Sequence, residues 1–190
     1  MDVLILPGFS PKNKTWAQAV QKDLNPFSPT TYVAWSHWET GKAEDQWAED
    51  EAGKINTNSQ GKQLNIIAKS LGTLVTMIIL KSKPELINKI ILCGIPITDL
   101  RKDDEKYYEQ LAIFPSDKLL CIQNIDDNHG SYIAVEKFLH SLNPDIKMIS
   151  TPRANHEYPY SKLFLDFLNK KGDLIKCCLH PILSPSTTPY

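Results

Sequence analysis

The sequence lacks an excess of charge of either sign. Its 190 residues include 21 lysines and arginines and 22 aspartates and glutamates, which gives a formal net charge of −1. Proteins that bind nucleic acids or anionic membranes do so through clustered basic residues, and the composition supplies no such surplus. We therefore expect a small-molecule partner and no nucleic acid, and we leave the oligomeric state open.

Long apolar runs are also lacking. No stretch approaches the roughly 20 apolar residues that are needed to cross a bilayer. The chain opens on a short strand-like run, Val3 to Leu6, without the basic region, long apolar segment and cleavage site of a secretory signal. These observations predict a soluble, unexported protein with a cytoplasmic location and no membrane span.

Cysteine is scarce, and its positions do not suggest a disulfide framework. Cys93 and Cys121 lie inside apolar strand-like runs, where cysteine behaves as a small buried hydrophobe. Cys177, Cys178 and His180 are too close together to reproduce the separated ligand pairs of a structural zinc site. A glycine-rich phosphate loop is also missing after the first apolar run, so we predict no metal and no cofactor.

What is present is a regular alternation of short apolar runs with segments of helical periodicity. This pattern is typical of an α/β fold, a three-layer sandwich whose mostly parallel sheet carries helices on both faces. We predict one such domain over residues 1–171 and an irregular C-terminal tail over 172–190. The six expected strands span residues 3–6, 31–35, 64–68, 89–93, 119–122 and 146–149. Helices are expected between them, including 43–56 and 103–112.

Polar residues follow several of these strands. The carboxyl ends of parallel strands meet at one edge of a sheet, so side chains in these loops are the candidates for chemistry. The loops carry Pro7-Gly8-Phe9 after the first strand, Ser70 after the third, Asp126 and Asp127 after the fifth, and His156 after the sixth. A nucleophile, a carboxylate and a histidine thus occur in the order Ser, Asp, His.

Ser70 lies where the third strand gives way to a helix. The local string Ala68-Lys69-Ser70-Leu71-Gly72 resembles the nucleophile elbow of α/β-hydrolases, in which small residues flank a serine on a sharp turn. Alanine stands at the first small position, where the family usually has glycine. The alternative is that Ser70 only caps the helix that begins near Leu71.

A serine nucleophile needs a base, and His156 is the candidate. Its loop resembles the one in which α/β-hydrolases carry their catalytic histidine, which takes the serine proton and later donates it to the leaving group. His129 is a lesser rival on the loop of the acid. The other histidines are placed less favourably: His37, His140 and His180.

A buried carboxylate should hold the histidine in the correct tautomer. Asp126 and Asp127 compete for this role. Asp127 fits the family's spacing to the following turn and helix somewhat better, and we favour it while keeping Asp126 as the alternative.

The resemblance also implies an oxyanion hole, and the expected positions of the loops suggest a rim around the substrate site. The amides of Leu71 and Phe9 are the expected donors to the developing oxyanion, with Ser10 as a less favoured substitute for Phe9. The expected rim is apolar and aromatic, which favours an acyl or small aromatic ester group. Its residues are Phe9, Trp38, Ile97, Tyr107, Tyr108 and Phe114, of which we select Trp38, Ile97 and Tyr108 as substrate-binding.

The resemblance to α/β-hydrolases covers about residues 1–171, with the first strand here corresponding to the family's third. The interval 97–117, where the family often inserts a lid, holds one short helix, so we expect an open site. Because the family's first two strands are missing, the chain resembles a minimal version of the family and is similar to compact members such as the retinoblastoma-binding-protein-9-like serine hydrolases. The resemblance implies a serine hydrolase of the carboxylesterase or thioesterase type, cleaving a small ester, thioester or amide through an acyl-enzyme on Ser70.

Two other functions fit the pattern. A catalytically silent hydrolase-like domain could bind a protein partner through exposed aromatics near Trp35, Trp38 and Trp47, or through the tail. A flavodoxin-like or nucleotide-binding sheet, in which Ser70 only starts a helix, is the third interpretation.

Overall fold

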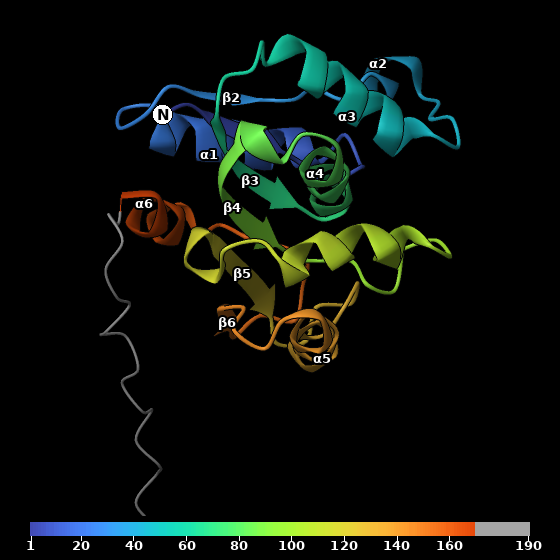
Figure 1. Cartoon of the computed structure of the whole chain (residues 1–190), viewed down its shortest axis with the longest axis vertical. Coiled ribbons are helices and arrows are strands. Elements are labelled where there is room, and N and C mark those ends of the chain that lie inside the picture. Colours follow the sequence, from blue (N-terminus) through green and yellow to red (C-terminus); the bar gives the residue numbers. More distant parts are fainter. Residues whose placement is uncertain (170–190) are drawn as a thin grey trace, which may run out of the picture.

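A computed structural model describes residues 1–169 and contains one six-stranded sheet. All neighbouring strands are parallel, in the order β2-β1-β3-β4-β5-β6 (Figure 1). The strands are β1 (Val3–Leu6), β2 (Thr30–Tyr32), β3 (Leu64–Lys69), β4 (Ile87–Cys93), β5 (Leu119–Asn124) and β6 (Met148–Thr151). The predicted α/β class with a parallel sheet is confirmed. The predicted tail, with Cys177, Cys178 and His180, lies outside the described residues.

Helices cover both faces of the sheet. α1 and α6 pack on one face, and α3, α4 and α5 pack on the other together with the 3-10 helix η2. The α-helices are α1 (Asn13–Leu24), α2 (His37–Thr40), α3 (Trp47–Asn58), α4 (Leu71–Ser82), α5 (Tyr132–Leu142) and α6 (Ser161–Asn169). The 3-10 helices are η1 (Pro84–Leu86), η2 (Asp104–Ala112) and η3 (Ser116–Lys118).

The apolar strands are buried on both sides, because successive side chains of a strand point to opposite faces. In β4, Ile90 and Leu92 join the core beneath α3, α4 and α5, whereas Ile91 and Cys93 join the core beneath α1 and α6. Cys93 and Cys121 are buried free thiols, in agreement with their reading as small hydrophobes. Burial raises the pKa of both.

Several predicted boundaries differ from the structure; for example, the helix expected over 43–56 is α3, which spans Trp47–Asn58. The second strand ends at Tyr32, and Trp35 lies beyond it with its indole directed to the loop after β1. The segment predicted as a surface helix over 103–112 is the 3-10 helix η2. The last strand begins at Met148, because Ile146 is buried within the core beneath α5 and does not pair in the sheet.

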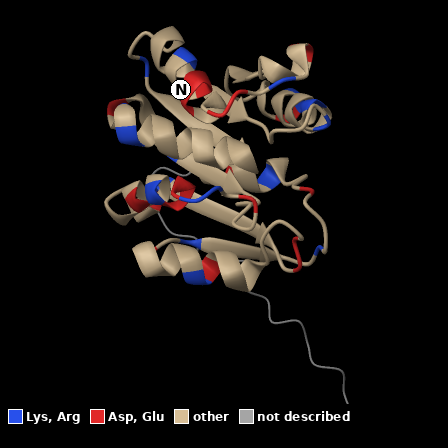
Figure 2. Cartoon of the chain, turned by 90° about the vertical axis from the view of Figure 1, so that its right-hand side faces the viewer, with Lys and Arg blue, Asp and Glu red and all other residues tan. Residues whose placement is uncertain are grey.

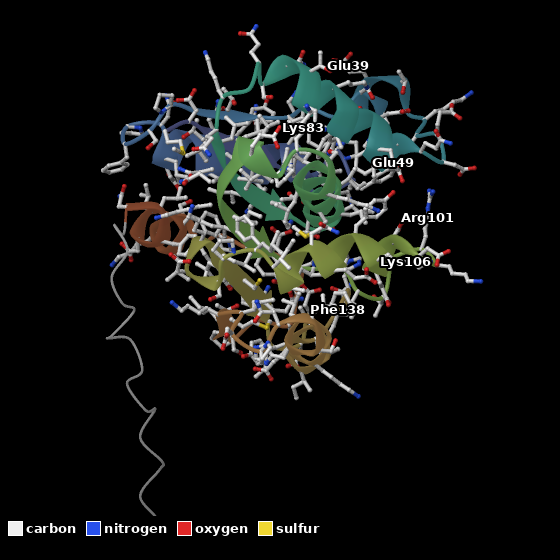
Figure 3. All side chains as sticks on the ribbon, in the orientation of Figure 1. Glu39, Glu49, Lys83, Arg101, Lys106 and Phe138 are labelled. Carbon is white, nitrogen blue, oxygen red and sulfur yellow. The ribbon has the colours of Figure 1, made fainter. Side chains whose placement is uncertain are left out.

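Charged residues of both signs are interspersed over the described surface (Figure 2). Side chains such as Glu39, Glu49 and Arg101 lie at the periphery of the molecule in Figure 3. Among residues 1–169, no helix has the length and apolar character that crossing a membrane requires.

Candidate active site

Ser70 occupies the sharp turn between β3 and α4. Its backbone angles are φ 56° and ψ −133°, in a region that residues with a side chain rarely adopt. Hydrogen bonds of the Ser70 backbone hold the turn. The Ser70 amide donates to the carbonyl of Cys93, at the end of β4, at 3.0 Å. The Ser70 carbonyl accepts from the Thr73 amide at 2.8 Å and from the Thr73 hydroxyl at 2.6 Å. The Ser70 side chain makes no capping hydrogen bond to α4, which argues against a purely capping role.

The turn requires glycine two residues after Ser70, at Gly72. A Cβ atom added to Gly72 would lie 2.1 Å from the Leu6 carbonyl oxygen, so only glycine lets the start of α4 approach the end of β1 this closely. Gly8, in the loop after β1, approaches Ser70 in the same way, since an added Cβ would lie 3.0 Å from the Ser70 Cβ. The glycine at the end of the elbow string is therefore a packing requirement of this turn.

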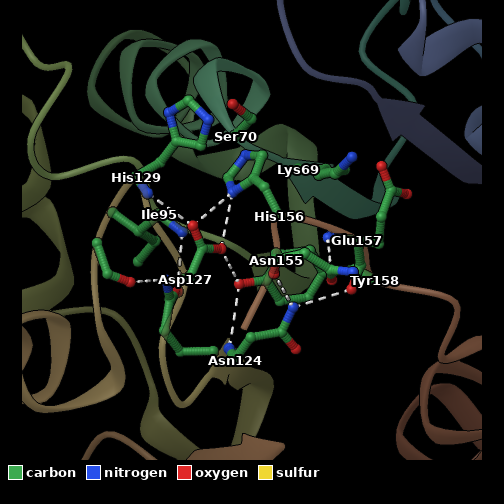
Figure 4. A network of polar contacts seen from close by, with 12 residues as sticks. Lys69, Ser70, Ile95, Asn124, Asp127, His129, Asn155, His156, Glu157 and Tyr158 are labelled. Carbon is green, nitrogen blue, oxygen red and sulfur yellow. Dashed lines mark hydrogen bonds and ion pairs between the residues drawn. The ribbon is translucent and has the colours of Figure 1, made fainter. Parts of the chain in front are cut away.

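His156 and Asp127 form a hydrogen-bonded pair at the same edge of the sheet (Figure 4). Nδ1 of His156 lies 2.7 Å from Oδ2 and 3.0 Å from Oδ1 of Asp127. The Asp127 side chain is 0% exposed and that of His156 is 15% exposed. Asp126, the alternative acid, is exposed and makes a backbone contact with Arg153. Of the two aspartates, the fold brings Asp127 to the histidine.

Asp127 is held ionised by three donors. Besides His156, it accepts a hydrogen bond from the Tyr158 hydroxyl at 2.5 Å and from the His129 amide at 2.8 Å. Burial by itself would raise the pKa of Asp127, but the hydrogen bonds from His156, Tyr158 and His129 outweigh burial and keep the pKa below its ordinary value. Asp127 can therefore fix one imidazole tautomer.

Tyr158 was not selected from the sequence. It is fully buried, its hydroxyl also accepts the Asn124 amide at 3.1 Å, and burial raises its pKa. A Cβ atom at Gly94 would lie 2.5 Å from the Tyr158 ring, so glycine is required where β4 ends beside it. The Asn124 side chain donates to the carbonyls of Asn155 and Glu157, which fixes the loop on both sides of His156. The one sequence signal was proximity: Tyr158 follows His156 by two positions.

The loop after β1 is anchored by three side chains from the segment after β2. The Trp35 indole donates to the carbonyls of Pro7 and Gly8 at 3.1 and 3.2 Å. The Phe9 carbonyl accepts hydrogen bonds from the Trp38 indole and from Nε2 of His37, each at 2.7 Å. The Phe9 and His37 rings also stack, with centroids 4.1 Å apart. His37, whose position in the sequence is less favourable for the base than that of His156, therefore supports this loop.

A cavity of about 730 Å³ lies beside the elbow, the loop after β1 and the loop that carries His156. Ser70, His156, Phe9 and Leu71 all line it, and Leu71 is the first residue of α4, where helix amides lack an intrahelical acceptor. Nε2 of His156 is buried and has no hydrogen-bond partner among the described residues. The remaining lining residues are Ser10, Lys12, Asn13, Thr15, Trp16, Ala19, Lys69, Asp99, His129, Glu157 and Pro159.

The substrate rim differs from the one expected. Tyr108 is 0% exposed, and its hydroxyl lies 2.6 Å from that of Thr73, so it packs behind the elbow and has no surface for a substrate. Trp38 and Ile97 are half-buried, pack against the core, and do not line the cavity. Four residues of α1 line the cavity instead: Asn13, Thr15, Trp16 and Ala19. No pattern in the sequence indicated that α1 borders the site.

His129, the rival base, lies beside His156. The two ring centroids are 4.3 Å apart, and Nδ1 of His129 contacts Oδ2 of Asp99 at 2.5 Å. The His129–Asp99 pair is more exposed than the His156–Asp127 pair, with side chains 37% and 45% exposed. Trp35 and Trp47, expected as an exposed docking surface in the silent-domain alternative, are buried.

No family model and no curated protein matches the sequence. Solved structures do match. The chain is similar to an α/β serine hydrolase without a lid from Xanthomonas campestris, with 14% identity over 82% of this chain and 72% of that one, and a TM-score of 0.60. An esterase from Pyrococcus furiosus matches with 16% identity over 88% and 79% of the two chains and a TM-score of 0.67. Est1E from Butyrivibrio proteoclasticus, with ferulic acid bound, matches with 14% identity over 89% and 90% and a TM-score of 0.62.

The fold is that of the α/β-hydrolases. At these identities the likeness establishes the architecture and leaves the activity to be argued from the site. In the α/β-hydrolase fold of this chain, β1 to β6 supply the whole sheet, and the loops after β1, β3, β5 and β6 meet around Ser70 and His156.

Proposed function

We propose that this chain is a serine hydrolase that cleaves a small ester, thioester or amide through an acyl-enzyme on Ser70. The observation that carries the proposal is the hydrogen bond between His156 and the buried Asp127, with His156 lining the same cavity as Ser70. The backbone of Ser70 has the strained geometry of a nucleophile elbow. The order Ser, Asp, His along the chain is the order used by α/β-hydrolases.

In the first step, Oγ of Ser70 attacks the substrate carbonyl carbon, and its proton passes to Nε2 of His156. The Nδ1–H of His156 stays on its hydrogen bond to Asp127, which remains ionised and stabilises the imidazolium. The carbonyl oxygen becomes an oxyanion. We assign the amides of Leu71 and Phe9 as its donors, with the Phe9 loop held in place by His37 and Trp38.

Collapse of the tetrahedral intermediate breaks the bond to the leaving group, which takes the proton from Nε2 of His156. A water molecule then attacks the acyl group on Ser70 and gives its proton to His156. The second intermediate collapses to a carboxylic acid, and Ser70 regains its proton. The cycle needs no metal or cofactor, and its partner is a small acyl compound.

The compact sheet and the short segment between β4 and β5 also support a resemblance to the retinoblastoma-binding-protein-9-like hydrolases and an open site. We retain this grouping and a cytoplasmic location as parts of the proposal.

Trapping of the acyl-enzyme tests the mechanism. Parent protein is mixed with para-nitrophenyl acetate, quenched in acid within seconds, and its intact mass measured. We expect an acetyl adduct that peptide mapping places on Ser70, that decays with time, and that is absent in Ser70→Ala. Ser141→Ala, on the exposed side of α5, is the matched control and should retain the adduct. Folded parent protein with neither adduct nor turnover would support the silent binding domain instead.

A further inference from the structure

Lys69 directly precedes the nucleophile and is buried in the cavity wall. Its exposure is 3%, and its ammonium donates to Oδ1 of Asn13 at 2.7 Å. The ammonium also lies 5.6 Å from the centroid of the Trp16 ring, a distance at which a cation is attracted to the ring face. The proposed acyl-transfer steps use none of these contacts.

The charge of Lys69 is only partly compensated. Within residues 1–169, no carboxylate lies within ion-pair distance of its ammonium, and Asn13 takes one of its three N–H donors. Burial lowers the pKa of Lys69, and the carboxylate of Glu157 opposes this effect more than any other charge. A buried ammonium with free donors costs free energy unless an anion completes its shell.

The direction of Asn13 is fixed as well. Its Nδ2 donates to the Ser10 carbonyl at 3.1 Å, which keeps Oδ1 toward Lys69. Ser10, Asn13 and Lys69 line the same cavity as Ser70. The ammonium is therefore held at the wall of the proposed reaction site by a preformed hydrogen bond, with donors left for a ligand.

We propose that Lys69 binds a carboxylate of the substrate, so that the preferred substrates are esters that carry a negative charge near the scissile bond. This inference rests on the proposed hydrolase function, because Ser70 is the reacting group. A hydrogen bond between an ammonium and a carboxylate is among the stronger ones in proteins. Glu157 is exposed and lines the same cavity as Lys69, so its carboxylate should repel the carboxylate of the substrate.

Lys69 should therefore favour a negatively charged ester over a neutral one, and Glu157 should disfavour it. For each variant we compare kcat/KM for a charged and a neutral ester of matched length. One pair places the charge in the acyl group: para-nitrophenyl hydrogen glutarate and para-nitrophenyl valerate. The other places it in the alcohol: meta-carboxyphenyl acetate and phenyl acetate.

We expect Lys69→Met to lower the charged-to-neutral ratio about tenfold in one of the two pairs, the effect of losing one hydrogen bond to a charged group. Glu157→Gln should raise the same ratio. Lys14→Met, which removes the same charge from an exposed position of α1 that does not line the cavity, should leave it unchanged. The pair that responds identifies the side of the ester that carries the charge.

A binding measurement keeps the two proposals apart. Glutarate is titrated into the Ser70→Ala protein, with pentane-1,5-diol as the neutral control, and the side-chain amide signal of Asn13 is followed by NMR. We expect glutarate alone to shift it, whether or not the parent hydrolyses any ester, and whether or not Lys69→Met folds. Equal ratios in Lys69→Met and parent, or no response to glutarate, overturns the role of Lys69.

Discussion

The Tyr158 hydroxyl donates to the same oxygen of Asp127 that contacts Nδ1 of His156, at 2.5 and 2.7 Å respectively. The buried Tyr158 side chain thereby helps to hold the carboxylate of Asp127, the proposed acid, in position. The Asn124 amide donates to the same hydroxyl and links it to the end of β5.

Tyr158→Phe should therefore weaken the orientation of Asp127. We expect kcat to fall about tenfold and the free energy of unfolding to fall by about 1–3 kcal/mol, because the variant leaves the buried Asn124 amide and one carboxylate site without the hydroxyl. Tyr160→Phe is the matched control, since its hydroxyl binds the Asn124 side chain and does not contact Asp127. Steady-state kinetics and urea unfolding measure both effects. Equal kcat in parent and Tyr158→Phe would contradict the positioning role.

The lowered pKa of Asp127 predicts a pH-dependent stability. A carboxylate whose pKa is lower in the folded state stabilises the protein above its unfolded pKa of about 4, and this contribution is lost as pH falls through the folded pKa. The stability difference between parent and Asp127→Asn should be largest near neutral pH and shrink below about pH 4. Urea unfolding at several pH values checks this, with the exposed Asp126→Asn as control. A difference that stays constant with pH would show that Asp127 is not held ionised by the fold.

Gly72→Ala should be strongly destabilising. The new Cβ would meet the Leu6 carbonyl, a backbone atom that cannot move aside without disturbing β1. We expect a loss of at least about 2 kcal/mol in the free energy of unfolding. Gly53→Ala, in α3, has open space around the added carbon and should gain up to about 1 kcal/mol. Opposite signs for the two glycines support the close packing of the elbow, and similar values would contradict it.

His37→Ala should impair the proposed oxyanion loop. The variant removes a hydrogen bond to the Phe9 carbonyl and the ring that stacks on Phe9. We expect kcat/KM to fall by about tenfold to a hundredfold, because a displaced Phe9 amide stabilises the oxyanion less well. His140→Ala, whose imidazole contacts the Ile146 carbonyl, is the control and should lose little activity. Full activity in His37→Ala would place the second oxyanion donor elsewhere.

The sequence predicted the parts of this molecule that depend on local patterns. Runs such as Ile90 to Cys93 are apolar on both faces and so indicated central parallel strands. Loop position after a strand indicated Ser70, His156 and both Asp126 and Asp127, and only the spacing of the resembled family favoured Asp127. Contacts between distant segments left no such pattern. Tyr158 binding Asp127 is one example, and Trp38 binding Phe9 is another.

The substrate side of the cavity was the least predictable part. The charged segment around Tyr108 indicated a surface aromatic. In the structure Tyr108 instead packs in the core against α4, and its hydroxyl is hydrogen-bonded to that of Thr73. In the sequence, Lys69 is only the residue between Ala68 and Ser70 in the elbow string, but its long side chain reaches Asn13 on α1. Which residues a long side chain contacts on another helix or strand depends on how these elements pack. The periodicity of the sequence does not contain this information.

Labelling with a fluorophosphonate probe followed by intact-mass measurement gives the decisive test of Ser70 as an activated nucleophile. Parent protein, Ser70→Ala, His156→Ala and the control Ser141→Ala are compared under identical conditions. We predict one adduct on the parent and on Ser141→Ala, and none on Ser70→Ala or His156→Ala. A folded parent without an adduct, or an adduct that persists in Ser70→Ala, would contradict the assignment of Ser70.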